Sequence, residues 1–213
     1  MNCDKSQMLL YAVTDRAWTG RQSLYEQVEC ALCGGATIVQ LREKQLAADA
    51  LLSEARQIAA LCRRYGVPFI LNDNVELVEA CGADGVHVGQ DDMAAALARQ
   101  KLGSRKIIGV SAHSVAEALT AVRDGADYLG SGAVFGSTTK KNVRPLAHET
   151  LREICASVPI PVVAIGGITK ENLPQLANTG ISGVALVSAI FAAPDIEAEC
   201  SLLRTMTEAM LLA

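Results

Sequence analysis

The 213-residue chain lacks long apolar runs, an excess of positive charge and an even number of cysteines. No apolar run approaches the length of a membrane span, so we expect no membrane partner and a cytoplasmic location. The formal net charge of -4 argues against a nucleic-acid partner, so any anionic ligand must be small. The seven cysteines are scattered along the chain, which is typical of reduced thiols rather than of a disulfide framework.

The apolar runs that do occur are short, rich in β-branched residues and separated by segments with a helical period. We expect eight strands, at residues 9–15, 36–43, 68–73, 85–89, 106–112, 128–135, 161–168 and 183–191. The segments between them, such as 51–66 and 114–126, place apolar residues three and four apart and carry a glycine close to the end. This pattern predicts helices with glycine caps.

The order of these elements predicts the fold. Strands that alternate with helices pair in parallel through right-handed crossovers. Eight such units in about 200 residues predict an α/β fold, a (β/α)8 TIM barrel. No linker or low-complexity segment divides the chain, so we expect a single domain over residues 1–213. A doubly wound open sheet is the alternative.

Polar residues gather where the predicted strands end. In the stretch PFILNDN, residues 68–74, an apolar run leads directly into Asn72, Asp73 and Asn74. One such end is ordinary turn chemistry, but in a barrel the side chains for chemistry come from the carboxyl ends of the strands. The polar residues and glycines at these ends are Thr14, Asp15, Gln40, Arg42, Lys44, Asn72, Asp73, Gln90, Asp92, Ser111, His113, Ser137, Thr139, Lys140, Gly166, Gly167 and Ser188. Their convergence on one rim predicts a functional site.

Two of these residues, Asp73 and Asp92, end neighbouring strands and can share a Mg²⁺ ion. Magnesium takes one or two protein carboxylates and completes its shell with water and substrate phosphate. Arg42, Lys44 and Lys140 would face the same open end of the barrel. Cations beside a bound metal neutralise the charge of a diphosphate group. The alternatives are that the aspartates cap the following helices and that Arg42 and Lys44 belong to a solvated charged loop.

The last two predicted strands end in Gly166, Gly167 and Ser188, which suit a second phosphate. Glycines let the backbone approach a ligand, and main-chain N–H groups in such turns bind anions. Barrels often bind phosphate after strands seven and eight, and two anions in one mouth indicate transfer between them. No nucleophile is paired with a base. We expect His87 to pack inside the barrel and His148 to lie at the exposed start of a helix.

Eight motifs occur in order from about residue 9 to residue 192: YAVTD, VQLREK, LNDN, GADGVHVGQDD, IIGVSAH, GADYLGSGAVFGSTTK, VVAIGGI and GVALVSAI. Together they resemble the thiamine-phosphate synthase (thiamine phosphate pyrophosphorylase) family. The resemblance implies that 4-amino-2-methyl-5-(diphosphooxymethyl)pyrimidine is joined to 4-methyl-5-(2-phosphooxyethyl)thiazole, which gives thiamine phosphate and diphosphate. It also implies that the pyrimidine diphosphate ionises first and that the thiazole nitrogen captures the carbocation. Catalysis then means stabilising the departing diphosphate.

The resemblance also implies roles for individual residues. The substrate-binding set would be Gln40, Arg42, Lys44, Asn72, Ser111, Ser137, Thr138, Thr139, Lys140, Gly167, Val187 and Ser188. The pyrimidine diphosphate would be held by Gln40, Arg42, Lys44, Asn72 and Ser111, and Lys140 would reach the leaving diphosphate. The thiazole phosphate would be bound by Ser137, Thr138, Thr139, Gly167, Val187 and Ser188. The catalytic residues would be Arg42, Lys44, Ser111 and Lys140. Asp73 and Asp92 would bind magnesium, because the family pattern Gly-Gln-x-Asp selects Asp92 over Asp91.

The sequence departs from the family pattern at a few positions and leaves two rival functions open. Gly136 and Ser137 stand where the family often has proline and threonine, and Asn74 stands where arginine is frequent, which leaves the local charge open. Related thiazole tautomerases share the barrel but use a histidine in the sixth strand segment, where this chain has Ala133. A non-catalytic phosphate sensor is the other rival, and the intact set of cations and carboxylates argues against it. We also expect a homodimer.

Overall fold

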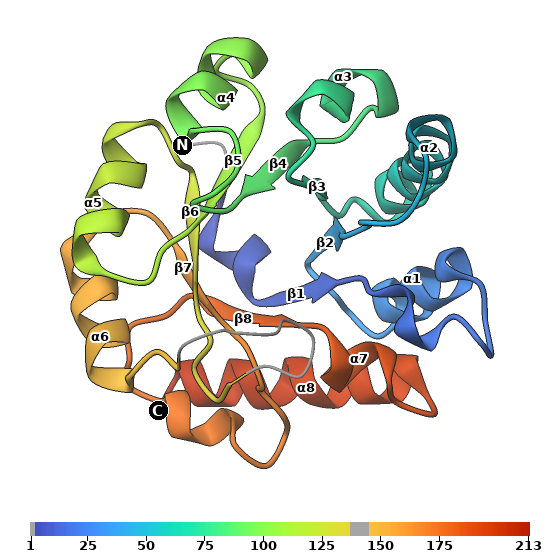
Figure 1. Ribbon diagram of the computed structural model, residues 1–213. Coiled ribbons are helices and arrows are strands. Elements are labelled where there is room, and N and C mark those ends of the chain that lie inside the picture. Colours follow the sequence, from blue (N-terminus) through green and yellow to red (C-terminus); the bar gives the residue numbers. More distant parts are fainter. Residues whose placement is uncertain (1–2, 137–144) are drawn as a thin grey trace.

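The computed structural model describes residues 3–136 and 145–213, and its sheet is a closed barrel of parallel strands. The strands follow one another around the barrel in sequence order, and β8 pairs with β1 (Figure 1). They are β1 Leu10–Val13, β2 Ile38–Leu41, β3 Phe69–Asn72, β4 Gly85–Val88, β5 Ile107–Ser111, β6 Tyr128–Gly132, β7 Val162–Ile165 and β8 Gly183–Leu186. The predicted (β/α)8 barrel is therefore confirmed, and the open sheet is wrong.

Helices surround the barrel (Figure 1). The α-helices are α1 Leu24–Cys33, α2 Ala48–Tyr65, α3 Val78–Cys81, α4 Ala95–Leu102, α5 Val115–Arg123, α6 His148–Ser157, α7 Ser188–Phe191 and α8 Ile196–Leu211, and the 3-10 helices are η1 Lys5–Met8, η2 Arg16–Trp18, η3 Val75–Leu77 and η4 Leu173–Leu176. As predicted, α2 stops at a glycine cap, Gly66, whose φ of 67° lies in the left-handed region. Within the described part of the chain, none of the helices combines the length and the apolar character that crossing a membrane requires.

The observed strands are shorter than the apolar runs that predicted them. The run 183–191, for example, divides into β8 and the short helix α7. Ile190 and Phe191 of that run are buried, but in helix packing rather than in the sheet. An apolar run therefore predicts the first residue of a strand better than its last residue, because the helix that follows must also bury apolar residues.

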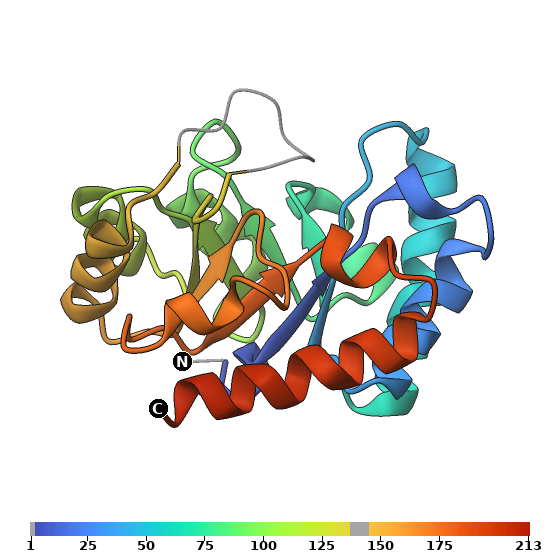
Figure 2. The same ribbon diagram turned by 90° about the horizontal axis from the view of Figure 1, so that it is seen from below.

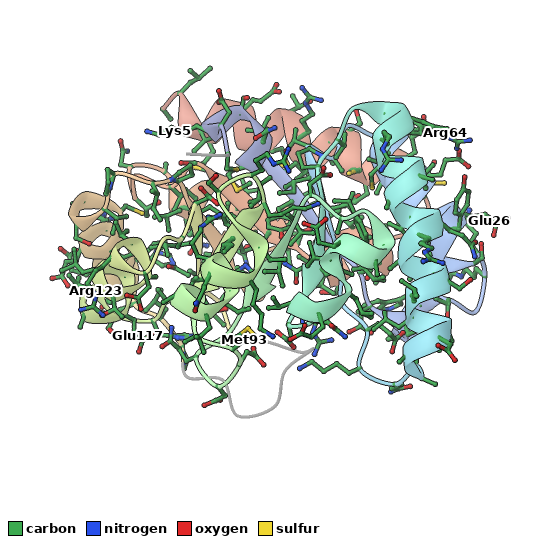
Figure 3. All side chains as sticks on the ribbon, turned by 90° about the horizontal axis from the view of Figure 1, so that it is seen from above. Lys5, Glu26, Arg64, Met93, Glu117 and Arg123 are labelled. Carbon is green, nitrogen blue, oxygen red and sulfur yellow. The ribbon has the colours of Figure 1, made fainter. Side chains whose placement is uncertain are left out.

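The interior of the barrel is packed at its amino end, which we call the floor. Inward side chains of the strands form one cluster with residues that precede β1: Cys3, Met8, Tyr11, Val13, Ile38, Ile70, Ile107, Tyr128, Val163 and Ala185. Gly109 on β5 makes room for Tyr128, because a Cβ atom at Gly109 would lie 2.1 Å from Cζ of the tyrosine ring. Figure 3 shows Lys5, which precedes β1, and Met93, which follows β4, at opposite ends of the molecule. The carboxyl ends of the strands are left as the place for a ligand.

Figure 2 shows the barrel from the side, with the start of β1 and the end of α8 at one end of the molecule. The loops that follow β2 and β4 lie at the opposite end (Figure 2). The parallel strands all run toward those loops, so their polar ends are collected on one face of the barrel. The end of α8 therefore lies away from the predicted site.

Candidate active site

A cavity of about 880 Å³ opens at the carboxyl ends of the strands, and we call it the mouth. Ligand pockets commonly have volumes of roughly 300–1,000 Å³. The predicted site residues that line the mouth are Gln40, Arg42, Lys44, Asn72, Asp73, Asp92, Ser111, Gly167, Val187 and Ser188. The other four predicted site residues, Ser137, Thr138, Thr139 and Lys140, lie outside the described residues. Every predicted site residue that the structure describes is thus part of one cavity wall.

Arg42 is held at the mouth by the segment that follows β1. Its main-chain N–H donates to the hydroxyl of Thr14 at 3.0 Å, and its guanidinium donates to Oδ2 of Asp15 at 3.2 Å. The Arg42 and Asp15 side chains are only 18% and 16% exposed, so salt screens this pair less than a surface pair. A guanidinium has five N–H donors, and the pair with Asp15 leaves others for a phosphate group.

Glu43 stabilises the loop that follows β2 by accepting hydrogen bonds. Its side chain is 4% exposed, and its carboxylate accepts hydrogen bonds from Arg16 and from the main-chain N–H groups of Gln45 and Leu46. Arg16 also pairs with Glu54 on α2. Burial alone would raise the pKa of Glu43, but the hydrogen bonds from Arg16 and the main chain outweigh it and hold the pKa below its ordinary value. The loop is tied down at its centre rather than freely solvated.

We expect Glu43→Gln to destabilise the fold by about 1–3 kcal/mol, because Arg16 and two main-chain N–H groups lose a charged acceptor. The same change should raise KM for the diphosphate substrate that the resemblance implies, because the loop carries two of the cations that face the mouth. Urea unfolding and steady-state kinetics measure the two effects. Glu29→Gln is the control, since Glu29 pairs with Arg64 on an exposed surface and such pairs contribute about 0–1 kcal/mol. Equal effects of the two changes would contradict the role of Glu43.

Asp73 and Asp92 lie beside each other at the mouth. Asp73 has a φ of 63°, a left-handed conformation that aspartate tolerates, and its Oδ2 lies 3.2 Å from Nζ of Lys44. Oδ2 of Asp92 accepts from the N–H of Gly89 at 2.7 Å. Burial raises the pKa of Asp73, the neighbouring Asp92 carboxyl raises it further, and Lys44 acts in the opposite direction. A cation between the two carboxylates would relieve their repulsion.

The alternative that the two aspartates cap helices is wrong. Asn74 is the N-cap of η3 and accepts from the N–H of Leu77 at 3.2 Å. Ala94 stands at the N-cap of α4, where no side chain makes a capping hydrogen bond. Over residues 3–136 and 145–213, no group of three His, Cys, Asp or Glu side chains is placed to hold a metal ion. Two carboxylates fit Mg²⁺, which commonly takes the rest of its shell from water and substrate phosphate.

In magnesium-free buffer, Asp73 should make the free energy of unfolding depend on pH. Because the folded state raises its pKa above the ordinary value of 3.8, folding favours the protonated form. Stability should therefore fall as the pH rises from about 3.8 through the raised pKa. Asp73→Asn should remove this slope, and asparagine also tolerates the left-handed backbone. Urea unfolding at a series of pH values checks this; the same slope in wild type and variant would contradict it.

The opposite side of the mouth is built from main chain. β7 and β8 lie across the barrel from β3 and β4. Gly167, after β7, has a φ of 65°, and a Cβ atom there would lie 2.6 Å from the carbonyl oxygen of Phe135, so only glycine fits. Nδ2 of Asn172 donates to the carbonyl oxygen of Gly167 at 2.9 Å. Val187 and Ser188 follow β8, and Ser188 begins α7. The two predicted anion positions are thus on opposite walls.

The structure confirms the predicted position of His87 and corrects the predicted exposure of His148. His87 packs inside the barrel as predicted, but its Nε2 also lies 3.0 Å from the hydroxyl of Ser111, a contact that the sequence reasoning missed. The strand period of two could have revealed it, because it turns both residues inward on neighbouring strands. His148 begins α6 as predicted but is half-buried rather than exposed, because its ring packs edge-on against Phe135 at a centroid distance of 5.1 Å.

The fold and the mouth define a (β/α)8 barrel enzyme whose cavity is lined by cations and a pair of carboxylates. The sequence matches the family described as thiamine monophosphate synthase over residues 10–190. The chain belongs to this family.

Relatives and a solved structure agree with this assignment. Thiamine-phosphate synthase of Chloroflexus aurantiacus is 48% identical over 198 residues, which are 92% of this chain and 91% of that protein. Thiamine-phosphate synthase of Ruminiclostridium cellulolyticum is 48% identical over 188 residues, covering 88% of this chain and 90% of that protein. The thiamine phosphate pyrophosphorylase structure from Pyrococcus furiosus superposes with a TM-score of 0.90 at 38% identity, covering 97% of this chain and 98% of that one. The predicted enzyme class, a transferase that forms thiamine phosphate, is confirmed.

Proposed function

We propose that the mouth binds the diphosphate of the pyrimidine substrate through Mg²⁺ held by Asp73 and Asp92 and through the cations of the loop after β2. The C–O bond between the pyrimidine methylene group and the diphosphate breaks, and its electron pair leaves with the diphosphate oxygen. The thiazole nitrogen then donates its lone pair to the methylene carbocation and forms the new C–N bond. The products are thiamine phosphate and diphosphate.

The observation that carries this proposal is the meeting of Arg42, Lys44, Asp73 and Asp92 in the wall of one cavity. When bound, Mg²⁺ would neutralise charge on the departing diphosphate. Arg42 supplies N–H donors at a position that Asp15 and Thr14 fix in advance, so little reorganisation is needed as charge develops. Lys44 is 56% exposed and is available for a phosphate oxygen once a cation satisfies Asp73.

The opposite wall suits the second substrate. Gly167 after β7 and Val187 and Ser188 after β8 line the mouth, and main-chain N–H groups in such turns bind phosphate. A thiazole phosphate held there would direct its ring toward the pyrimidine across the mouth. Holding both partners in one cavity converts capture of the carbocation into a reaction between neighbours.

Diphosphate release measured with both substrates, at a series of Mg²⁺ concentrations, tests the proposal. We expect release that depends on Mg²⁺ and is accompanied by an equal amount of thiamine phosphate. A thiazole tautomerase or a phosphate sensor would release no diphosphate. Release at the same rate after removal of Mg²⁺ by a chelator would contradict the magnesium site but not the transferase reaction.

We also infer that the enzyme works in the cytoplasm and as a homodimer. All seven cysteines are free thiols, which suits a reducing compartment. Large apolar side chains remain exposed on the described surface, among them Leu202 at 44% and Leu211 at 37% on α8, and a second copy can cover such side chains. Light scattering of the purified protein gives the oligomeric state, and a monomer at micromolar concentration would contradict the dimer.

A further inference from the structure

A chain of hydrogen bonds crosses the interior of the barrel along the wall of the mouth. Nε2 of Gln40 donates to the hydroxyl of Tyr11 at 2.7 Å. The hydroxyls of Tyr11 and Tyr128 lie 2.7 Å apart. The Tyr128 hydroxyl lies 3.0 Å from Nδ1 of His87, and Nε2 of His87 lies 3.0 Å from the hydroxyl of Ser111. The hydrogen-bond chain therefore joins Gln40 on β2 to Ser111 on β5. Tyr11 and His87 within it also line the mouth, and Tyr128 between them is buried.

The direction of every hydrogen bond in this hydrogen-bond chain follows from the donor at one end, Gln40. The Tyr11 oxygen accepts from Gln40, so its single proton goes to Tyr128, the other partner of this hydroxyl among the described residues. Tyr128 then gives its own proton to Nδ1 of His87. An Nδ1 atom that accepts must be unprotonated, so the neutral imidazole carries its proton on Nε2 and donates to Ser111. Reversing one bond alone would leave a buried hydroxyl proton without an acceptor, which is costly.

The surroundings hold this chain in place. Tyr11 is 1% exposed and Tyr128 is fully buried, so bulk water does not compete for their hydroxyls. Burial raises the pKa of both tyrosines, and both therefore keep the protons that the chain needs. The Tyr128 ring occupies the space left by Gly109, and it packs against Tyr11 and His87 at centroid distances of 5.8 Å and 5.5 Å.

We propose that Tyr11, Tyr128 and His87 are positioning residues that fix the hydrogen-bonding polarity of Gln40 and Ser111 at the mouth. One amide N–H of Gln40 is engaged by Tyr11, and its carbonyl oxygen remains as an acceptor for a ligand. One lone pair of the Ser111 oxygen is engaged by His87, and its hydroxyl proton remains as a donor. This inference rests on the proposed function, in which the two residues hold the pyrimidine.

This fixed polarity selects an aminopyrimidine over its oxo analogue. The amino group can only donate, which suits Gln40, and an unprotonated ring nitrogen can only accept, which suits Ser111. The 4-oxo analogue reverses both groups, because it carries a carbonyl acceptor beside a ring N–H donor. In that arrangement the analogue's carbonyl oxygen would face the carbonyl oxygen of Gln40, and the proton of Ser111 would lose its acceptor, so the analogue should bind less well.

The ¹⁵N NMR signals of the His87 ring test the chain without any substrate, so failure here is distinguishable from failure of the proposed function. The protein has three histidines, and the His148→Gln variant together with His87→Gln assigns their signals. We expect wild-type His87 to be protonated on Nε2 alone. Tyr128→Phe should give a mixture of tautomers, because Nδ1 loses its donor. Protonation of Nδ1 in the wild type, or an unchanged tautomer in Tyr128→Phe, would overturn the proposal.

Kinetics with the amino substrate and its 4-oxo analogue test the consequence for specificity. We expect wild type to prefer the amino substrate in kcat/KM by more than about 100-fold, and Tyr128→Phe to reduce that ratio by at least about tenfold, or ~1.4 kcal/mol. A merely structural role would lower both values equally and leave the ratio unchanged, which would overturn the proposal. Tyr25→Phe is the control, because the Tyr25 hydroxyl binds Arg64 on an exposed surface.

Tyr11→Phe is a second variant that keeps the test decisive if Tyr128→Phe folds poorly. It detaches Gln40 from the chain but leaves the Tyr128 hydroxyl on Nδ1 of His87. We expect the ratio for the two substrates to fall while the His87 tautomer stays as in the wild type. A ratio equal to that of the wild type would overturn the role assigned to Tyr11.

Discussion

Arg42→Met is expected to lower kcat by about 10²–10³-fold, the loss typical of removing one preorganised donor from a developing negative charge. The negative charge on the diphosphate grows as the C–O bond breaks, so the interaction with Arg42 is stronger in the transition state than with bound substrate. Methionine keeps the unbranched apolar stem and removes only the charge and the donors. Single-turnover rates of diphosphate release measure the effect on the chemical step.

Two further variants separate the contributions of charge and position. Arg42→Lys keeps the charge but loses the planar fork of donors, so we expect an intermediate rate. Arg64→Met is the control, because Arg64 lies on α2 and pairs with Glu29 away from the mouth (Figure 3). A rise in KM with an unchanged kcat in Arg42→Met would mean that Arg42 binds substrate and transition state equally, which would contradict its catalytic role.

Asp92→Asn is expected to raise the Mg²⁺ concentration needed for half-maximal activity by about 10–100-fold or more. Mutating even a residue that only hydrogen-bonds to a metal ligand can lower metal affinity by about 10–100-fold. The asparagine oxygen can still accept from the N–H of Gly89, as Oδ2 of Asp92 does, so the fold should change little. The measurement is a Mg²⁺ titration of activity beside a thermal unfolding curve. Asp91→Asn is the matched control, one residue away in the same wall. Equal shifts in the two variants would contradict the choice of Asp92.

The barrel could be predicted because its strands are buried on both faces. Such strands are nearly continuous apolar runs, and the chain places one before each helical segment in regular alternation. The polar residue at each strand end then marks the mouth, so Arg42, Asp73 and Ser111 could be placed together before any coordinates were known. The same signal misjudged strand length at residues 183–191, since the apolar residues of α7 continue the run of β8.

The contacts that position the site could not be predicted. Glu43 looks like one charge among several in QLREK, and only the folded chain brings Arg16 to it and Glu54 to Arg16. Tyr11 and Tyr128 are 117 residues apart, and a strand period shows that each points inward but not which side chains meet across the barrel. The space that Gly109 leaves for Tyr128 is likewise a property of the closed sheet.

A crystal structure of the protein with Mg²⁺ and diphosphate tests the central claim most directly. We expect the metal between the carboxylates of Asp73 and Asp92, with diphosphate oxygens on the metal, on the guanidinium of Arg42 and on the ammonium group of Lys44. Diphosphate bound at the floor of the barrel, or a metal coordinated by neither aspartate, would contradict it.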